Sequence, residues 1–139
     1  VGHRIPKKNI LISSGPTRSK VELLNSTRML IEKGYNIYST AGTAKFFKEN
    51  GIDTQILYWP DEDKEPNIME YLHDRKIDLV INIPKNHTKR ELDNGYKIRR
   101  AAVDYNIPLI TNARLASAFI YAICKVDPTE IAIKSWDEY

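Results

Sequence analysis

Five short apolar runs divide the chain, and most of them are rich in β-branched residues with little polar alternation. They are NILIS (9–13), NIYS (36–39), TQILYW (54–59), DLVINI (78–83) and PLIT (108–111). Runs of this kind are typical of strands that are buried on both faces of a parallel sheet. A further run, IAIK (131–134), predicts a short sixth strand.

Segments with helical periodicity lie between these runs. In the first segment, one helix face carries Leu23, Leu24, Thr27, Leu30 and Ile31. Ser19, with Glu22 three residues later, predicts a capping box at the start of this helix, and Gly34 predicts its end. In the second segment, Thr43 is a candidate cap and Gly42 a candidate turn residue.

The later helices carry cap signals as well. Asn67, with Glu70 at the box position, predicts the start of one helix, and Asn112 predicts the cap of the last. We expect this last helix, 113–125, to turn four apolar side chains inward: Leu115, Phe119, Ala122 and Ile123. Strand and helix thus alternate five times. This alternation predicts a single α/β domain over residues 1–139, with three layers doubly wound around a five-stranded, mainly parallel sheet.

Polar residues follow the predicted strands where each of them ends. The segments are SSGPTRSK (13–20), STAGTA (39–44), WP (59–60), NIPKNHTK (82–89) and TNA (111–113). The carboxyl ends of parallel strands meet at one rim, where ligands of open α/β sheets bind. Helix N-termini and lysines at this rim favour negative charge, so we expect an anion site there. For STAGTA alone, helix capping by Thr43 is the competing interpretation.

Composition and charge narrow the class of protein. The net charge of +3 is too small to indicate nucleic-acid binding, although basic residues gather between Lys85 and Arg100. No apolar run approaches the ~20 residues of a membrane-spanning helix, and no signal-peptide pattern opens the chain. The single cysteine, Cys124, lies in the apolar run FIYAIC and cannot form an internal disulfide. We therefore expect a buried thiol and a cytoplasmic setting.

Sequence motifs for catalysis are missing. The chain contains no GxGxxG, no GxxxxGK[ST] and no GxSxG. Its histidines, His3, His73 and His87, are scattered, and no Cys/His spacing indicates zinc. We expect no catalytic residue, metal or cofactor in this domain, and electrostatic capture of an anion without chemistry.

The segments YSTAGTAKFFKENGI, IDLVINIPKNHTK and YKIRRAAVDYNIPLITN, in this order, resemble the methylglyoxal-synthase-like fold. More closely, they are similar to the regulatory C-terminal domain of the carbamoyl-phosphate synthase large chain. The similarity runs from about Asn9 to Cys124. It implies an allosteric domain from a longer chain, in which preceding synthetase domains use ATP, Mg and K and a glutaminase small subunit assists. Pyrimidine and arginine biosynthesis are the pathways that the resemblance implies.

The resemblance also implies which residues contact the effector. It places these contacts on Ser14, Lys20, Thr40, Thr43 and Asn82. Gly42 in the same loop, and Trp59 and Lys85 on the same rim, complete the candidate site. Trp59 and the segment NIPKN look more like the urea-cycle synthetase, whose activator is N-acetylglutamate. A basic, hydroxyl-lined pocket instead suits phosphate, which favours a nucleotide such as UMP or IMP.

Two enzymes of the same fold are alternatives. Methylglyoxal synthases remove a proton from dihydroxyacetone phosphate and need a carboxylate in a G-G-D-type loop together with a histidine. Here the loop reads WPDEDKEPN and the expected H-D reads Leu92-Asp93, although Asp61, Asp63 or Glu65 could still serve as a base. Inosine-monophosphate cyclohydrolases share an S-T-x-G-T-A-K stretch, but their proline-rich signature is absent here.

Overall fold

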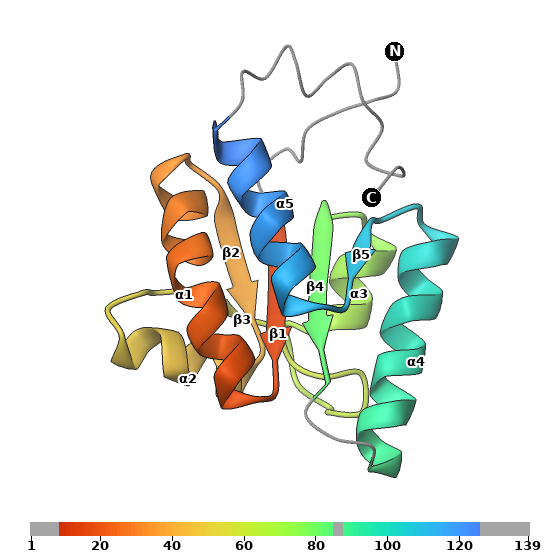
Figure 1. Ribbon diagram of the computed structural model, residues 1–139. Coiled ribbons are helices and arrows are strands. Elements are labelled where there is room, and N and C mark those ends of the chain that lie inside the picture. Colours follow the sequence, from red (N-terminus) through yellow and green to blue (C-terminus); the bar gives the residue numbers. More distant parts are fainter. Residues whose placement is uncertain (1–8, 85–87, 126–139) are drawn as a thin grey trace.

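A five-stranded sheet forms the centre of the computed structural model, which describes residues 9–84 and 88–125 (Figure 1). Its strands are β1 (Asn9–Ser14), β2 (Asn36–Ser39), β3 (Gln55–Ile56), β4 (Leu79–Ile83) and β5 (Leu109–Ile110). The strand order is β3-β2-β1-β4-β5, and every pairing is parallel. The predicted α/β class and five-stranded sheet are confirmed, and the sheet is wholly parallel. The predicted sixth strand lies outside the described residues.

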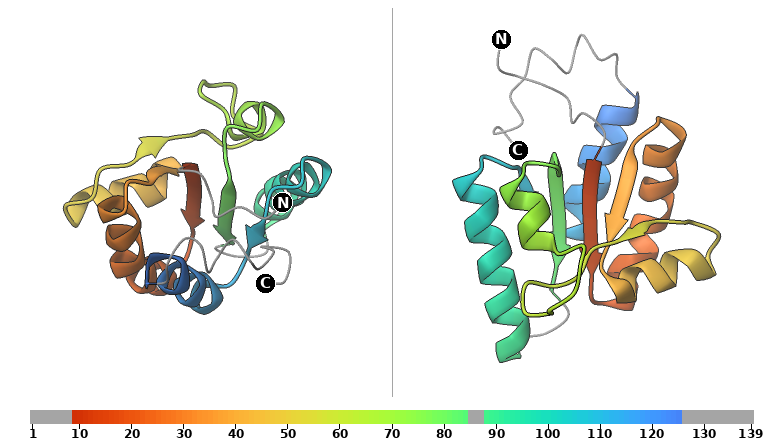
Figure 2. Two further views of the ribbon diagram at one scale, coloured as in Figure 1. Left: turned by 90° about the horizontal axis from the view of Figure 1, so that it is seen from above. Right: turned by 180° about the vertical axis from the view of Figure 1, so that it is seen from behind.

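Five helices cover the two faces of this sheet. They are α1 (Thr17–Glu32), α2 (Ala41–Glu49), α3 (Ile68–His73), α4 (Lys89–Asp104) and α5 (Ala113–Lys125). Helices α1, α2 and α5 contribute to the apolar cluster on one face, whereas α3 and α4 contribute to the cluster on the other. The two views of Figure 2 show these groups on opposite sides of the strands. The predicted three-layer arrangement is therefore confirmed.

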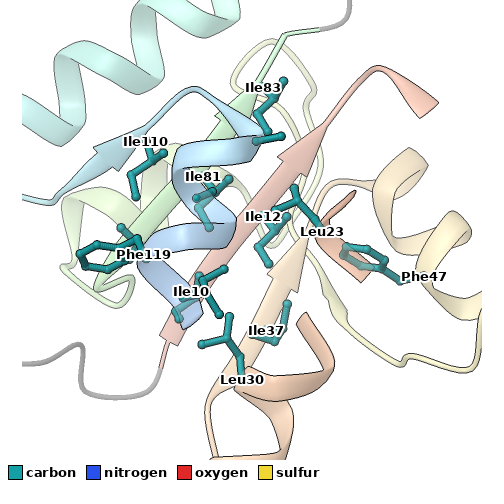
Figure 3. Close-up of a cluster of buried hydrophobic side chains, with 14 of the residues drawn as sticks. Ile10, Ile12, Leu23, Leu30, Ile37, Phe47, Ile81, Ile83, Ile110 and Phe119 are labelled. Atoms are coloured by element: carbon teal, nitrogen blue, oxygen red, sulfur yellow. The ribbon is translucent and has the colours of Figure 1, made fainter. Parts of the chain in front are cut away.

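Side chains of β1 alternate between these two clusters. Ile10 and Ile12 pack with Leu23 and Phe47 on the α1 side, as the close-up of Figure 3 shows. Leu11 packs in the opposite cluster, against α3 and α4. All three β1 side chains are fully buried, which explains why the run NILIS lacks polar alternation.

The edge strands are shorter than predicted. The run 54–59 forms only the two-residue strand β3, and Tyr58 then pairs with Asn67 in an isolated parallel bridge. β5 likewise has two residues rather than four. Both strands have a neighbour on one side only. Apolar sequence alone therefore does not extend their pairing.

Two predicted helix starts are wrong. α1 begins at Thr17 after Pro16, so Ser19 lies inside the helix and forms no capping box. Proline has the φ of a helix start already fixed and needs no side-chain cap. α2 begins at Ala41, which makes Thr43 its third residue rather than its cap and places Gly42 within the helix.

The other helix signals agree better with the structure. Gly34 follows α1 with a φ of 91°, a backbone conformation that favours glycine. Asn67 and Asn112 accept hydrogen bonds from the backbone N–H groups of Met69 and Leu115, as predicted for caps. Three inward side chains of α5 are buried or partly buried, namely Phe119, Ala122 and Ile123.

Two apolar side chains were assigned to the wrong helix face. Ile31 is 41% exposed and Leu115 is 45% exposed. Their neighbours Leu30 and Ala116 are fully buried in the cluster formed with α1, α2 and α5, so Ile31 and Leu115 lie on the side of their helices that faces away from it. Cys124 is buried as expected, and this burial raises the pKa of its thiol.

Candidate functional site

A cavity of about 180 Å³ lies at the carboxyl ends of the central strands. These strand ends form the lower edge of the sheet in Figure 1. Four predicted segments converge on it: those that follow β1, β2 and β3 and the one that begins at the end of β4. The residues that line it are Ser13, Ser14, Gly15, Lys20, Thr40, Gly42, Thr43, Trp59, Ile83 and Glu91. We refer to this cavity as the rim pocket.

Most of the predicted effector contacts line the rim pocket. They are Ser14, Lys20, Thr40, Gly42, Thr43 and Trp59. Asn82 is buried in β4, paired in register with Ser13, and is not among the lining residues. Lys85 lies outside the described residues.

The sequence analysis placed Ser13, Gly15 and Ile83 in the polar rim segments without naming them as contacts, and it missed Glu91. For Glu91 a signal was present, because Thr88 and Glu91 have the S/T-x-x-E spacing of a capping box. In the structure, Thr88 Oγ1 accepts a hydrogen bond from the Glu91 backbone N–H at 3.3 Å, and α4 begins at this point. The start of α4 therefore directs Glu91 to the pocket.

The Thr43 side chain links β1 to α2. Its hydroxyl oxygen accepts a hydrogen bond from the Ser14 backbone N–H at 3.0 Å and donates one to the Ser14 carbonyl at 3.2 Å. Thr40 Oγ1 lies 3.4 Å from Thr43 Oγ1 and 3.1 Å from Ser13 Oγ. A hydroxyl has one proton and two lone pairs. The proton and lone pairs of Thr43 are thus all engaged within the protein.

Ser14 differs from Thr43 in this respect. Its side-chain oxygen is buried with no hydrogen-bond partner, and the residue is 1% exposed. A buried hydroxyl without a partner carries a desolvation cost of about 1–3 kcal/mol. Because Ser14 also lines the rim pocket, a ligand there can supply the missing partner.

The first turn of α2 faces the same space. The backbone N–H of Ala44 bonds to the Thr40 carbonyl at 2.8 Å, which makes it the first intrahelical bond. The N–H groups of Ala41, Gly42 and Thr43 precede it and have no intrahelical acceptor. Together with the helix dipole, such N–H groups attract anions.

Two charged side chains, Lys20 and Glu91, line the pocket with these neutral donors. The Lys20 ammonium lies 5.9 Å from the centre of the Phe46 ring, a cation–π distance. Phe46 thereby holds the lysine beside α2.

Trp59 belongs to a loop that its own hydrogen bonds hold in place. Its backbone N–H donates to Glu62 Oε1 at 3.0 Å, and its carbonyl accepts from Asn67 Nδ2 at 2.8 Å. The indole packs against the α3–α4 cluster while also lining the pocket. Both interpretations of Trp59, as a core residue and as a wall of the site, therefore apply.

The same loop is fastened to α4 by an ion pair. Arg90 Nε and Nη2 donate to the two carboxylate oxygens of Asp61 at 2.6 and 3.2 Å. These hydrogen bonds hold the pKa of Asp61 below its usual value. Asp61 is therefore a weak base, and both of its carboxylate oxygens accept hydrogen bonds from Arg90.

A second cavity, of about 410 Å³, adjoins the first across Ile83. It lies between the starts of α1 and α5, and its basic residues are Arg18 and Arg114. Within residues 9–84 and 88–125, no group of His, Cys, Asp or Glu side chains is arranged to hold a metal ion. No helix in this part of the chain is long and apolar enough to cross a membrane.

Comparison with known proteins places this chain in one family. The family model of MGS-like domains matches residues 22–111, and the chain belongs to that family. It is 43% identical over 131 residues to the multifunctional protein ura1 of Schizosaccharomyces pombe, covering 89% of this chain and 6% of that protein. It is 39% identical over 108 residues to the carbamoyl phosphate synthase large chain of Thermoplasma acidophilum, covering 78% of this chain and 10% of that one.

A solved structure supports the fold. Methylglyoxal synthase from Elizabethkingia anophelis NUHP1 superposes with a TM-score of 0.60 at 18% identity, covering 84% of this chain and 79% of that one. The resemblance to MGS-like domains of carbamoyl-phosphate synthase large chains is thus confirmed by sequence. The chain spans about a tenth or less of the length of the relatives named above.

The role of Thr43 as a link between β1 and α2 can be tested with Thr43→Val, which keeps the side-chain shape. Loss of the hydroxyl leaves the buried Ser14 N–H without an acceptor, so we expect about 1–3 kcal/mol less stability. The exposed Thr17→Val variant, at the start of α1, should change stability by about 0.5 kcal/mol or less. Urea unfolding measures both, and equal changes in the two variants would contradict the link.

Proposed function

We propose that this chain is the allosteric effector-binding domain of a carbamoyl-phosphate synthase, and that the rim pocket holds an anionic effector. The observation that carries this proposal is the buried, unpartnered hydroxyl of Ser14 beside the free N–H groups of the α2 start. Capping does not account for this arrangement, because Thr43 engages β1 rather than its own helix.

The proposed anion accepts hydrogen bonds from three kinds of donor. The α2 backbone supplies N–H groups, Ser14 supplies its hydroxyl proton, and Lys20 supplies a full positive charge. The Thr40 and Thr43 hydroxyls position these donors. Thr43 contributes its backbone N–H to the anion, since its hydroxyl is already engaged. Asn82 remains a contact predicted from the resemblance, and Lys85 remains one predicted from its place on the rim of the sheet.

The size of the rim pocket bears on the identity of the effector. Pockets for drug-sized ligands span about 300–1,000 Å³, so a cavity of about 180 Å³ suits the charged end of a ligand rather than a whole nucleotide. In our proposal the rest of the ligand lies against Trp59. This ring can stack on the base of UMP or IMP, or cover the aliphatic chain of N-acetylglutamate. The hydroxyl and amide lining favours the phosphate of a nucleotide.

The proposal extends to the parent protein through the relatives. Because their chains include carbamoyl phosphate synthase large chains, we infer that effector binding here adjusts ATP-dependent carbamoyl phosphate synthesis. The synthetase domains of the same chain and a glutaminase small subunit are the proposed partners. ATP, Mg and K belong to those domains, and the pathways served are those of pyrimidines and arginine.

Methylglyoxal synthase activity is the second candidate, because a solved methylglyoxal synthase shares the fold. The carboxylates that could serve as its base, Asp61, Asp63 and Glu65, do not line the rim pocket. The Arg90 guanidinium donates hydrogen bonds to the Asp61 carboxylate and keeps the pKa of Asp61 low. We therefore propose that this domain is not itself catalytic.

Lys20→Met tests the charge of the rim pocket while keeping the side-chain stem against Phe46. Loss of a charged hydrogen bond of about 1.5–3 kcal/mol should weaken binding of UMP or N-acetylglutamate roughly 10- to 100-fold. Arg18→Met removes the same charge from the next cavity and should leave the affinity unchanged. Calorimetric titration measures both, and a loss confined to Arg18→Met would place the ligand in the larger cavity.

Gly42→Ala tests whether the ligand lies against the α2 start. A Cβ at Gly42 meets nothing within 4 Å, so alanine should raise stability by up to about 1 kcal/mol. The same methyl group occupies pocket space and should weaken effector binding about tenfold or more. Gly95→Ala, inside α4 with equally open surroundings, is the matched control. It should gain stability with unchanged affinity. Unchanged affinity in both variants would show that the ligand does not contact the start of α2.

The two candidate functions are separated by incubating the chain with dihydroxyacetone phosphate. We expect no release of methylglyoxal above the uncatalysed rate, because the candidate bases Asp61, Asp63 and Glu65 do not line the rim pocket. Among the described lining residues, Glu91 is the one carboxylate that could act in their place. Colorimetric detection of methylglyoxal measures this. Turnover that disappears in Glu91→Gln would replace the regulatory proposal with the lyase.

A further inference from the structure

Glu91 is an unexpected residue in a pocket built for anions. Among the described residues that line the rim pocket it is the single acidic side chain, and Lys20 is the single basic one. A carboxylate repels a phosphate or carboxylate ligand, and it accepts hydrogen bonds without donating any. Its presence therefore opposes the function that every other polar group of the pocket supports.

We propose that Glu91 makes the pocket selective for anions that carry a hydrogen-bond donor, a hydroxyl or an amide N–H, close to their charged group. This inference rests on the proposed effector function and names the ligand class of that site. Bare inorganic anions are disfavoured by repulsion. An anion with a suitably placed donor gains a charge-assisted hydrogen bond that offsets this repulsion.

The main chain at Glu91 is held in place from two sides. Its own backbone N–H is bound by Thr88 Oγ1, which fixes the first turn of α4. The adjacent Arg90 forms the two hydrogen bonds to Asp61, in the loop that carries Trp59. The carboxylate thus belongs to a fixed helix start on the side of the pocket opposite α2. A fixed acceptor discriminates between ligands better than a mobile one, because less entropy is lost when it binds.

Among residues 9–84 and 88–125, no ion pair joins Glu91 to a basic side chain. The ion pairs of the described residues are His73–Asp74, Arg90–Asp61 and Arg100–Asp104. Lys20 lies against the Phe46 ring, and no ion pair joins it to Glu91. Arg90 interacts electrostatically with Glu91, but its guanidinium is hydrogen-bonded to Asp61, so the Glu91 carboxylate remains available to a ligand.

Electrostatic repulsion and donor selection predict changes of opposite sign. In Glu91→Gln, inorganic phosphate should bind about three- to tenfold more tightly, because the repulsion is removed. The affinity for UMP should rise less than this or not at all, because in the variant the ribose hydroxyls no longer meet a charged acceptor. We expect the ratio of the UMP and phosphate affinities to fall about tenfold, the size of one charge-assisted hydrogen bond.

The experiment titrates three probes into the chain by calorimetry: inorganic phosphate, UMP and 2′,3′-dideoxyuridine 5′-monophosphate, which lacks the ribose hydroxyls. N-acetylglutamate and glutarate form an equivalent pair for an effector with an amide N–H. Asp93→Asn is the matched control, because Asp93 lies on α4 two residues further along and does not line the pocket. The Thr88 cap uses the Glu91 backbone N–H, which glutamine keeps, so α4 should still begin at the same residue.

The outcomes separate this inference from the function on which it rests. Wild-type preference for the donor-bearing member of a pair, lost in Glu91→Gln and kept in Asp93→Asn, supports the selective role. Equal ratios in all three proteins, or the same change in both variants, would overturn that role while leaving anion binding in place. Failure of the wild-type chain to bind any probe would overturn the effector function itself, and the selective role with it.

Discussion

The main chain of β1 has to find hydrogen-bond partners at the point where the sheet ends, and the local structure depends on how it does so. β1 lies between β2 and β4 and is buried on both faces, so water cannot satisfy its last polar groups. The N–H of Gly15 bonds to the Ile83 carbonyl at 2.9 Å, and the N–H of Ser14 bonds to Thr43. Thr43 therefore has to stand against the end of β1, and this requirement places the start of α2 beside the pocket.

The same requirement separates two kinds of hydroxyl that look alike in the sequence. Thr43 is 2% exposed and Ser14 is 1% exposed, yet one hydroxyl is saturated and the other has no partner. A saturated hydroxyl contributes to stability, whereas an unsatisfied one lowers stability until a ligand arrives. Functional sites retain such locally unfavourable groups, because binding then recovers the cost. Burial alone does not distinguish these roles, but a full account of protons and lone pairs does.

The sequence predicted the strands that are buried on both faces of the sheet, and it was less reliable for the starts of the helices. The parallel sheet could be predicted because central strands such as β4 are buried throughout and mostly apolar. Asn67 and Asn112 marked helix starts because their side chains do cap. The start of α1 was missed because Pro16 needs no cap, and Thr43 was misread because its partner, Ser14, is 29 residues away in the chain. Such a long-range contact leaves no periodic pattern. Most of the pocket could still be predicted, because parallel strands bring their carboxyl ends to one rim whatever the details.

The position of the rim pocket determines what a bound effector is able to influence. Lys20 belongs to α1 and Gly42 to α2 on one face of the sheet, whereas Glu91 belongs to α4 on the other. A ligand shifts the balance between two arrangements only by the difference in its affinity for them. An effector that contacts all three helix starts would have different affinities for two arrangements of the domain in which the distances between these starts differ. Since Arg90 joins α4 to the Trp59 loop, such a motion carries that loop along with the helix. In the proposed complex, the anion and its donor group would contact opposite layers of the domain, and a small ligand would thereby be able to alter the relation between these layers.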